Sequence, residues 1–267
     1  LNAPIKRDQM DVQLVDLDGD FDLDFFGPNR SSNTGGNHYL MLNDGTGAFT
    51  NVSNTLPGNS STVYEAEVGD LDGDTDIDMF FVSLSGFNEG HIENTNPFGN
   101  PPSWQLGGSL SGSGDDNEVV LIDYDNDSDY DALIGSLASR EYLWRNNGFL
   151  SWSNAASQIQ AVSDSTLDAT VADLDNDGDL DLVVNNFNDP ASIYKNTISD
   201  RKVGHYLQVE LEGPAGNRNG LGAKLTLTTN NGLQFQEFSA GRGFESSCAQ
   251  KVHSVSAEGE HTLGRIG

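Results

Sequence analysis

The chain has 267 residues and a formal charge of −28, with 41 acidic residues against 13 basic ones. Nucleic acids and anionic membrane surfaces attract basic patches, so this charge argues against both as partners. No apolar run approaches the roughly 20 residues that cross a bilayer, which argues against membrane insertion. The first residues show no signal-peptide pattern, and Leu1 is typical of a mature or excised end.

The same order of short elements recurs four times between residues 10 and 200. Each copy opens with a short strand, expected at 12–15, 65–68, 118–122 and 169–172. An aspartate-rich loop leads into a more hydrophobic strand, at 23–26, 77–84, 132–137 and 180–187. Third strands are expected at 38–42, 140–145 and 191–195, and fourth strands at 48–53 and 149–153. The second copy becomes irregular after Leu84, where three prolines within 94–102 predict a long surface loop.

The four loops share the pattern D-x-D-x-D-x-D-x-D, and their first aspartates are 54, 53 and 50 positions apart. A solvated acidic face does not require alternation at a fixed period, so four copies in the same context indicate a cation site. An EF-hand would need a glutamate at position 12 and flanking helices, and neither is present in the sequence pattern. The twenty candidate ligands are Asp16, Asp18, Asp20, Asp22, Asp24, Asp70, Asp72, Asp74, Asp76, Asp78, Asp123, Asp125, Asp127, Asp129, Asp131, Asp173, Asp175, Asp177, Asp179 and Asp181.

Oxygen ligands at alternate positions suit a hard ion of flexible geometry, and Ca²⁺ fits best. We therefore expect about four Ca²⁺ ions, each joining the first strand of a copy to the second. Positions 1, 3 and 5 would give side-chain oxygens, position 7 a backbone carbonyl, and position 9 would close the shell. The position-7 carboxylates would point to water. Gly19, Gly73 and Gly178 fall where the loop needs unusual dihedral angles.

Four short antiparallel strands in about 50 residues are the content of one propeller blade. The expected fold is all-β, with four blades at about 10–60, 61–113, 114–164 and 165–200 making up a region 1–200. A small β domain would follow at 201–267, with strands at 206–212, 224–229 and 233–238.

The loops resemble the VCBS and FG-GAP repeats, whose blades form calcium-binding β-propellers. The similarity is carried by Asp-Leu-Asp-Gly-Asp-Phe-Asp-Leu-Asp-Phe-Phe-Gly (16–27), the comparable segment 172–184 and Leu-Asn-Asp-Gly-Thr-Gly-Ala-Phe-Thr (42–50). Such relatives usually have about seven blades, whereas four copies are present here. The number leaves open whether a small ring closes or an incomplete one is completed by other means.

After Asn196 the sequence resembles the ASPIC/UnbV domain of cartilage acidic protein-like proteins. The matching residues are His-Tyr-Leu (205–207), Asn-Arg-Asn-Gly-Leu-Gly-Ala-Lys (217–224) and Gly-Arg-Gly-Phe-Glu-Ser-Ser (241–247). The family continues to a final strand that the sequence pattern after Val252 lacks, so the domain is expected to be incomplete. Either the chain is truncated or a neighbouring subunit supplies the strand, and residues 1–10 are a candidate donor.

No catalytic motif stands out. The acid pairs lie mostly in the metal loops, the five histidines are scattered, and no G-x-S-x-G elbow or phosphate loop is present. The chain is therefore not expected to be an enzyme, and a polysaccharide lyase is the least favoured function. Trp104, Tyr142, Trp144 and Trp152 leave a lectin-like glycan-binding propeller as an alternative, although blade core is the favoured explanation of these aromatic residues.

The favoured function is an extracellular, calcium-stabilised structural or adhesion module. Its partners would be other extracellular proteins or further copies of itself, in an oligomer or filament, and glycans in the lectin alternative. Secretion would make the sequons at Asn29, Asn51 and Asn59 glycosylation candidates. A fourth sequon at Asn126 lies inside a metal loop and carries less weight.

Overall fold

The computed structural model describes residues 9, 11–30, 38–58, 62–84, 88–111, 114–137, 139–162, 165–198, 205–229, 232–239, 252–256 and 262–263. The described chain is almost entirely β-structure, and its only helical segment is the short 3-10 turn η2 (Ser53–Thr55). None of the described helical structure is long and apolar enough to cross a membrane.

Four antiparallel sheets follow one another along the chain, and we number them sheets 1 to 4. Sheet 1 contains β1 (Gln13–Val15), β2 (Asp24–Gly27), β3 (Tyr39–Leu42) and β4 (Thr50–Asn51). Sheet 2 contains β5 (Val63–Gly69), β6 (Asp78–Ser83), β7 (Glu89–Asn96) and β8 (Ser103–Leu110). Sheet 3 contains β9 (Asp116–Ile122), β10 (Asp131–Ser136), β11 (Tyr142–Asn146) and β12 (Trp152–Asn154). Sheet 4 contains β13 (Thr166–Ala172), β14 (Asp181–Asn186) and β15 (Ser192–Tyr194).

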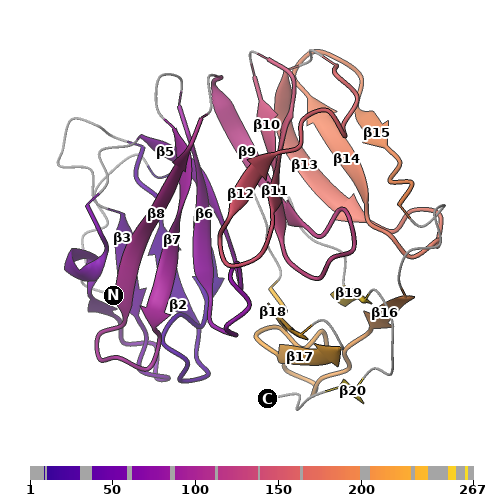
Figure 1. Cartoon of the computed structure of the whole chain (residues 1–267). Helices are drawn as coiled ribbons and strands as arrows, with labels where there is room; N and C mark the ends of the chain where they lie inside the picture. Colours follow the sequence, from indigo (N-terminus) through magenta and orange to yellow (C-terminus); the bar gives the residue numbers. More distant parts are fainter. Residues whose placement is uncertain are drawn as a thin grey trace.

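The sheets stand side by side in a row, with sheet 1 and sheet 4 at opposite ends (Figure 1). The first strand of each sheet contacts the first strand of the next, β1 with β5, β5 with β9 and β9 with β13. Within each sheet the strands pair in chain order. This stacking of four-stranded meanders confirms the expected all-β fold and is compatible with a propeller.

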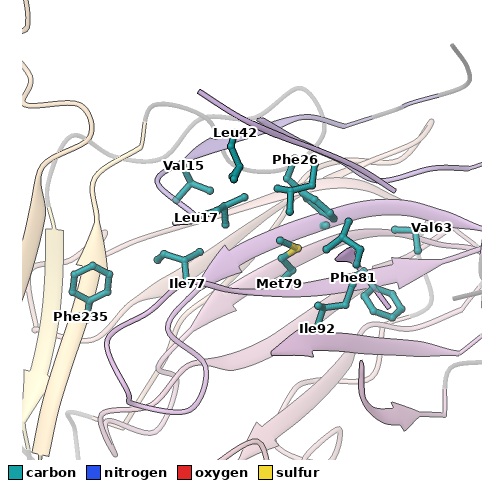
Figure 2. Packing of buried hydrophobic residues seen from close by; sticks show 13 residues of the cluster. Val15, Leu17, Phe26, Leu42, Val63, Ile77, Met79, Phe81, Ile92 and Phe235 are labelled. Carbon is teal, nitrogen blue, oxygen red and sulfur yellow. The ribbon is translucent and has the colours of Figure 1, made fainter. Parts of the chain in front are cut away.

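Three hydrophobic clusters fill the seams between neighbouring sheets. Sheets 1 and 2 enclose a cluster that includes Phe26, Leu40 and Met79, which Figure 2 shows from close by. Phe80 and Ile134 belong to the cluster between sheets 2 and 3, and sheets 3 and 4 enclose a third. Alternate residues of one strand thus face different seams. This explains why β6, β9 and β10 are buried along their whole length and have continuous apolar runs.

Two expectations about the sheets need correction. The stretch 94–102 is not one long loop, because β7 runs to Asn96 and pairs with β8 from Ser103 onward. The three prolines lie between the end of β7 and the start of β8, where the missing N–H of proline removes no hydrogen bond between the strands. The fourth copy provides three strands among the described residues rather than four.

The C-terminal region forms two small sheets beneath the row (Figure 1). One pairs β16 (His205–Val209) with β19 (Val252–Ser256), and the other has the order β18 (Gly232–Glu237), β17 (Lys224–Thr229), β20 (Thr262–Leu263). The segment from Val252 onward supplies β19 and β20, whereas the sequence pattern suggested no closing strand there. That the domain is incomplete stays a prediction. The proposed donor strand at residues 1–10 lies almost wholly outside the described residues.

The hairpin β17–β18 packs onto sheets 1 and 2. Phe235 is buried, at 8% exposure, and belongs to the hydrophobic cluster between these sheets. In Figure 2 it lies at the edge of that cluster, on the side of Ile77. The C-terminal region is therefore in contact with the row of sheets.

Candidate metal centres

Each aspartate loop connects the first two strands of its sheet and is organised by its first carboxylate. Asp16 accepts hydrogen bonds from the backbone N–H groups of Gly19, Asp20 and Phe21, at 2.7, 3.1 and 2.7 Å. In the second loop, Asp70 accepts hydrogen bonds from the backbone N–H groups of Gly73, Asp74 and Thr75, at 2.8–3.1 Å. A carboxylate that accepts several backbone amides fixes a tight turn around itself.

The turns use left-handed backbone conformations at the fourth and sixth loop positions. Gly19, Gly73 and Gly178 have φ of +79°, +83° and +96°, which confirms the expectation for these glycines. Non-glycine residues take the same conformation at Phe21, Thr75, Asn126, Ser128 and Asn176. Strain of this kind persists where surrounding interactions fix the backbone, and it is found preferentially at functional sites.

The last carboxylate of each loop joins the loop to the third strand. Asp78 accepts the backbone N–H of Leu71 at 2.9 Å and that of Asn94 at 2.8 Å. Asp24, Asp131 and Asp181 make the corresponding pairs of bonds, all at 2.8–3.1 Å. The ninth loop position is thus held rigidly from two sides, and its side chain is buried in every copy.

Carboxylate oxygens converge in all four loops, within 4.8 Å of one another. Three loops bring together positions 1, 3 and 9, and the third loop brings together positions 1, 3 and 5. The groups are Asp16, Asp18 and Asp24; Asp70, Asp72 and Asp78; Asp123, Asp125 and Asp127; and Asp173, Asp175 and Asp181. Asp20, Asp74 and Asp177 lie outside these groups and accept the backbone N–H two residues further along.

The loops have the properties of cation sites. Asp18 Oδ1 and Asp125 Oδ1 are buried oxygens without a hydrogen-bond partner, and both belong to the converging groups. A buried acceptor without a donor is costly, and a cation would satisfy it. All converging atoms are carboxylate oxygens, which favours Ca²⁺ over softer metals. The residues present therefore fit the ion that the sequence predicts.

The position-7 aspartates differ from expectation, because their carboxylates are turned inward instead of toward water. Asp76 and Asp179 are buried, at 8% and 0% exposure. The Oδ1 atoms of Asp22, Asp76 and Asp129 are buried and accept no hydrogen bond. The expectation took the backbone carbonyl as the ligand at this position, but the left-handed residue before each of these aspartates reverses the direction of the chain.

The pKa values of several loop carboxylates are raised above the ordinary value of 3.8. Burial is the main cause, and neighbouring aspartates add to it. The pKa rises to about 6 for Asp18 and Asp72, about 8 for Asp78 and Asp123, and about 10 for Asp131. Carboxylates with such pKa values hold protons near neutral pH unless a cation compensates their charge.

Sequence reasoning missed an asparagine that joins each sheet to the one before it. Asn94 Nδ2 donates to Leu17 O at 3.1 Å, Asn146 Nδ2 to Leu71 O at 2.7 Å, and Asn196 Nδ2 to Tyr124 O at 2.9 Å. We call these three residues the seam asparagines. Asn94 lies within the third strand of its sheet, Asn146 ends its strand and Asn196 follows its strand. Each acceptor is the second residue of the preceding loop. Asn43 has the same place in sheet 1, and the recurrence of asparagine at this point in every copy was the available signal.

A second repeated feature also escaped the sequence reasoning. Asp11, Glu65, Glu118 and Asp168 lie five residues before the first aspartate of their loops. Glu65 accepts the backbone N–H of Val119 in the next sheet at 2.8 Å, and Asp11 accepts that of Ala66 at 3.4 Å. Burial and the neighbouring Glu118 raise the pKa of Glu65 well above its usual range. Asp11 and Glu65 therefore belong to the seams and not to the metal loops.

The remaining candidate residues lie away from the loops or inside the fold. Trp144 and Trp152 pack in the cluster between sheets 2 and 3, and Trp104 packs against the cluster between sheets 1 and 2. These aromatic residues are core, as favoured from the sequence. Asn29 and Asn126 are buried, at 3% exposure each, and are poor glycan acceptors. Asn51 is exposed, and Asn59 lies outside the described residues.

Comparison with known families agrees with this geometry. A family model described as FG-GAP-like repeat matches residues 16–81 and 123–184, which contain all four aspartate loops. A second model, described as ASPIC and UnbV, matches residues 213–255. The chain therefore contains FG-GAP-like repeats followed by an ASPIC/UnbV domain. No curated protein matches the chain.

FG-GAP repeats are typical of extracellular or surface proteins and suggest an adhesion-like module of the β-propeller type. They often bind calcium, and the acidic groups described above could hold metal ions. FG-GAP and ASPIC/UnbV domains are generally non-catalytic.

Proposed function

We propose that this chain is a secreted structural or adhesion module whose four loops bind calcium, about one ion each. The observation that carries the proposal is the convergence of three carboxylates in every loop. In the first and third loops, one converging oxygen is also buried without a donor. The twenty loop aspartates supply the ligands, with positions 1, 3 and 9 foremost in loops 1, 2 and 4. The third loop uses positions 1, 3 and 5.

Calcium binding and folding are coupled in this proposal. The ion neutralises carboxylates that repel one another and connects the first strand of a sheet with the second. A ligand that binds only the folded state stabilises it by roughly 2.7 kcal/mol per site when its concentration is a hundred times Kd. Four such sites would contribute about 11 kcal/mol, which is comparable to the whole stability of an ordinary domain.

The test is thermal unfolding of the full chain in millimolar Ca²⁺ and in EGTA, followed by circular dichroism. We expect a large fall in the midpoint on chelation and its recovery when calcium is restored. Mg²⁺ at the same concentration is the control for ionic strength, and it should restore little because it requires a more rigid octahedral shell. A thermal midpoint that is the same in EGTA as in calcium would contradict the proposal.

Self-association is part of the proposal, with a second copy of the chain as partner. Leu174, Phe187 and Ile193 are exposed in sheet 4 and its connections, and Val12 and Leu14 are exposed in and just before β1. The residues 50 positions before Leu174 and Ile193 are Tyr124 and Leu143, which pack in the seam between sheets 3 and 4. The exposed faces thus have the chemistry of an internal seam, which supports sheet-to-sheet contact between copies.

Light scattering in calcium tests this part. We expect particles larger than a monomer at high protein concentration, and monomers for Ile193→Lys. A monomer at all concentrations would contradict self-association without affecting the calcium proposal. The lectin-like alternative receives less support, because its candidate tryptophans pack in the seams. Saturable, sugar-competed binding on a glycan array would favour it.

A further inference from the structure

Three of the four loops contain a basic side chain of the protein itself. Arg145, on β11, places Nε 2.8 Å from Asp125 Oδ2 and Nη2 2.6 Å from Asp127 Oδ2. Lys195 forms ion pairs with Asp175 and Asp177 in the fourth loop. In the first loop, Lys224 pairs with Asp16. These cations contact carboxylates of the converging groups.

Arg145 and Lys195 occupy equivalent positions, each directly before a seam asparagine. The backbone of that asparagine is hydrogen-bonded to the last aspartate of the loop, so the preceding residue is held beside the carboxylates. The residue at this place therefore lies beside the loop carboxylates in sheets 3 and 4. We call this place the gate position.

The second sheet has the opposite charge at the gate position. Glu93 is partly buried and directly precedes Asn94, whose backbone N–H donates to Asp78, the last aspartate of the loop, at 2.8 Å. Within the described residues, no lysine or arginine pairs with the second loop. Counting only the part of the chain that the structure describes, the second loop therefore has the most concentrated negative charge of the four.

The first loop receives its cation from the C-terminal region. The gate residue there is Leu42, which is apolar and belongs to the core. Lys224 reaches Asp16 from β17, with its Nζ also 5.1 Å from the ring centre of Phe21. Only 15% of the Lys224 side chain is exposed, so this ammonium group is well shielded from water.

We propose that the gate residue sets the calcium affinity of its loop, so that the second loop fills first and the third and fourth fill at higher calcium. The proposal rests on calcium binding by the loops, as proposed above. Within the described residues the second loop holds no cation that calcium would have to displace, and the negative charge of Glu93 adds attraction. In the third and fourth loops the ion binds beside Arg145 or Lys195, which repel it and occupy carboxylate oxygens.

The size of the effect follows from Coulomb's law. One unit charge about 6 Å from a divalent ion, in surroundings close to water, changes the affinity roughly tenfold. Removing Arg145 should therefore tighten the third loop about tenfold, and reversing the charge at Glu93 should weaken the second loop about a hundredfold. Without calcium, the same residues act on the stability of the fold in the opposite sense. Arg145 then stabilises the third loop because it relieves carboxylate repulsion, and Glu93 destabilises the second loop because it adds to that repulsion.

The experiment is a calcium titration of the full chain against a chromophoric chelator. The wild type should show one tight ion and a weaker class. Asp72→Asn should remove the tight ion, and Asp125→Asn should leave it. Glu93→Lys should move the tight ion into the weaker class, and Arg145→Leu should move one weak ion into the tight class. Arg140→Leu, an exposed residue before the same strand, is the control for net charge and should change neither class.

A second readout is thermal unfolding in EGTA. Arg145→Leu should lower the midpoint, and Glu93→Gln should raise it. Equal affinities for all ions in the wild type, or a tight ion lost through Asp125→Asn and kept in Asp72→Asn, would overturn the proposal. If Arg145→Leu does not fold, Glu93→Lys decides alone, since Glu93 lies at the partly exposed side of its strand. If the wild type binds calcium but its sites do not differ as predicted, only the proposal about the gate residues fails. The proposed calcium-binding function is then unaffected.

Discussion

Replacing a seam asparagine should destabilise the protein much more than replacing its counterpart in sheet 1. Asn146 donates through Nδ2 to Leu71 O at 2.7 Å, and both residues are fully buried. Asn146→Ala leaves that carbonyl without a donor, which costs about 1–3 kcal/mol. Asn43 donates at 3.3 Å to Leu23 O within its own sheet and is partly exposed. We expect Asn146→Ala to lower the free energy of unfolding by about 2 kcal/mol, and Asn43→Ala by less than about 1 kcal/mol.

The assay is chemical denaturation in saturating calcium, followed by tryptophan fluorescence. Trp144 and Trp152 lie in the seam that Asn146 closes, so their emission reports on it directly. The corresponding fall in the thermal midpoint should be about 4–8 °C for a protein of this size. Asn147→Ala, at the exposed neighbouring position, is the control for loss of an asparagine at the end of β11. If Asn146→Ala and Asn43→Ala differ by less than about 0.5 kcal/mol, the reasoning is wrong.

Two further predictions concern pH and the C-terminal hairpin. The pKa values of Asp78 and Asp123 are raised from 3.8 to about 8 by burial, so the calcium-free folded state binds more protons than the unfolded state between these values. Thermal unfolding in calcium-free buffer should show stability falling from pH 5 to pH 8, and saturating calcium should abolish or reverse that trend; a rise in the calcium-free protein would refute it. Phe235→Ala should cost about 3 kcal/mol in chemical denaturation, because Phe235 fills the cluster between sheets 1 and 2. Leu233→Ala, 46% exposed on the same strand, should cost under about 1 kcal/mol, and equal costs would mean that the hairpin does not dock there.

The sequence was sufficient for features that depend on local spacing. Five aspartates at alternate positions predicted four loops, and the structure brings carboxylates together in each. Gly19, Gly73 and Gly178 were correctly predicted to need unusual dihedral angles, and all three adopt positive φ. Strand order within a sheet could be predicted because neighbouring strands are also neighbours in the chain.

Features that depend on distant contacts could not be predicted in this way. Asn146 and Leu71 are 75 residues apart in the sequence. The local sequence Asn-Asn-Gly at 146–148 predicted only a tight turn and gave no sign of this distant contact. The direction of the position-7 carboxylates depends on backbone reversals that alternation does not encode. The strand β8 contains two glycines and few apolar residues, so only its pairing with β7 makes it a strand.

The position of the seam acceptors has a consequence for the mechanics of the chain. Each accepting carbonyl belongs to the residue between the first and third loop aspartates, which are the proposed calcium ligands. An ion in the loop of one sheet therefore fixes the anchor of the next sheet, so tension applied along the row would meet a resistance set by calcium. The seams would part in the order in which their loops lose calcium, and the seam between sheets 2 and 3 would be the last to open.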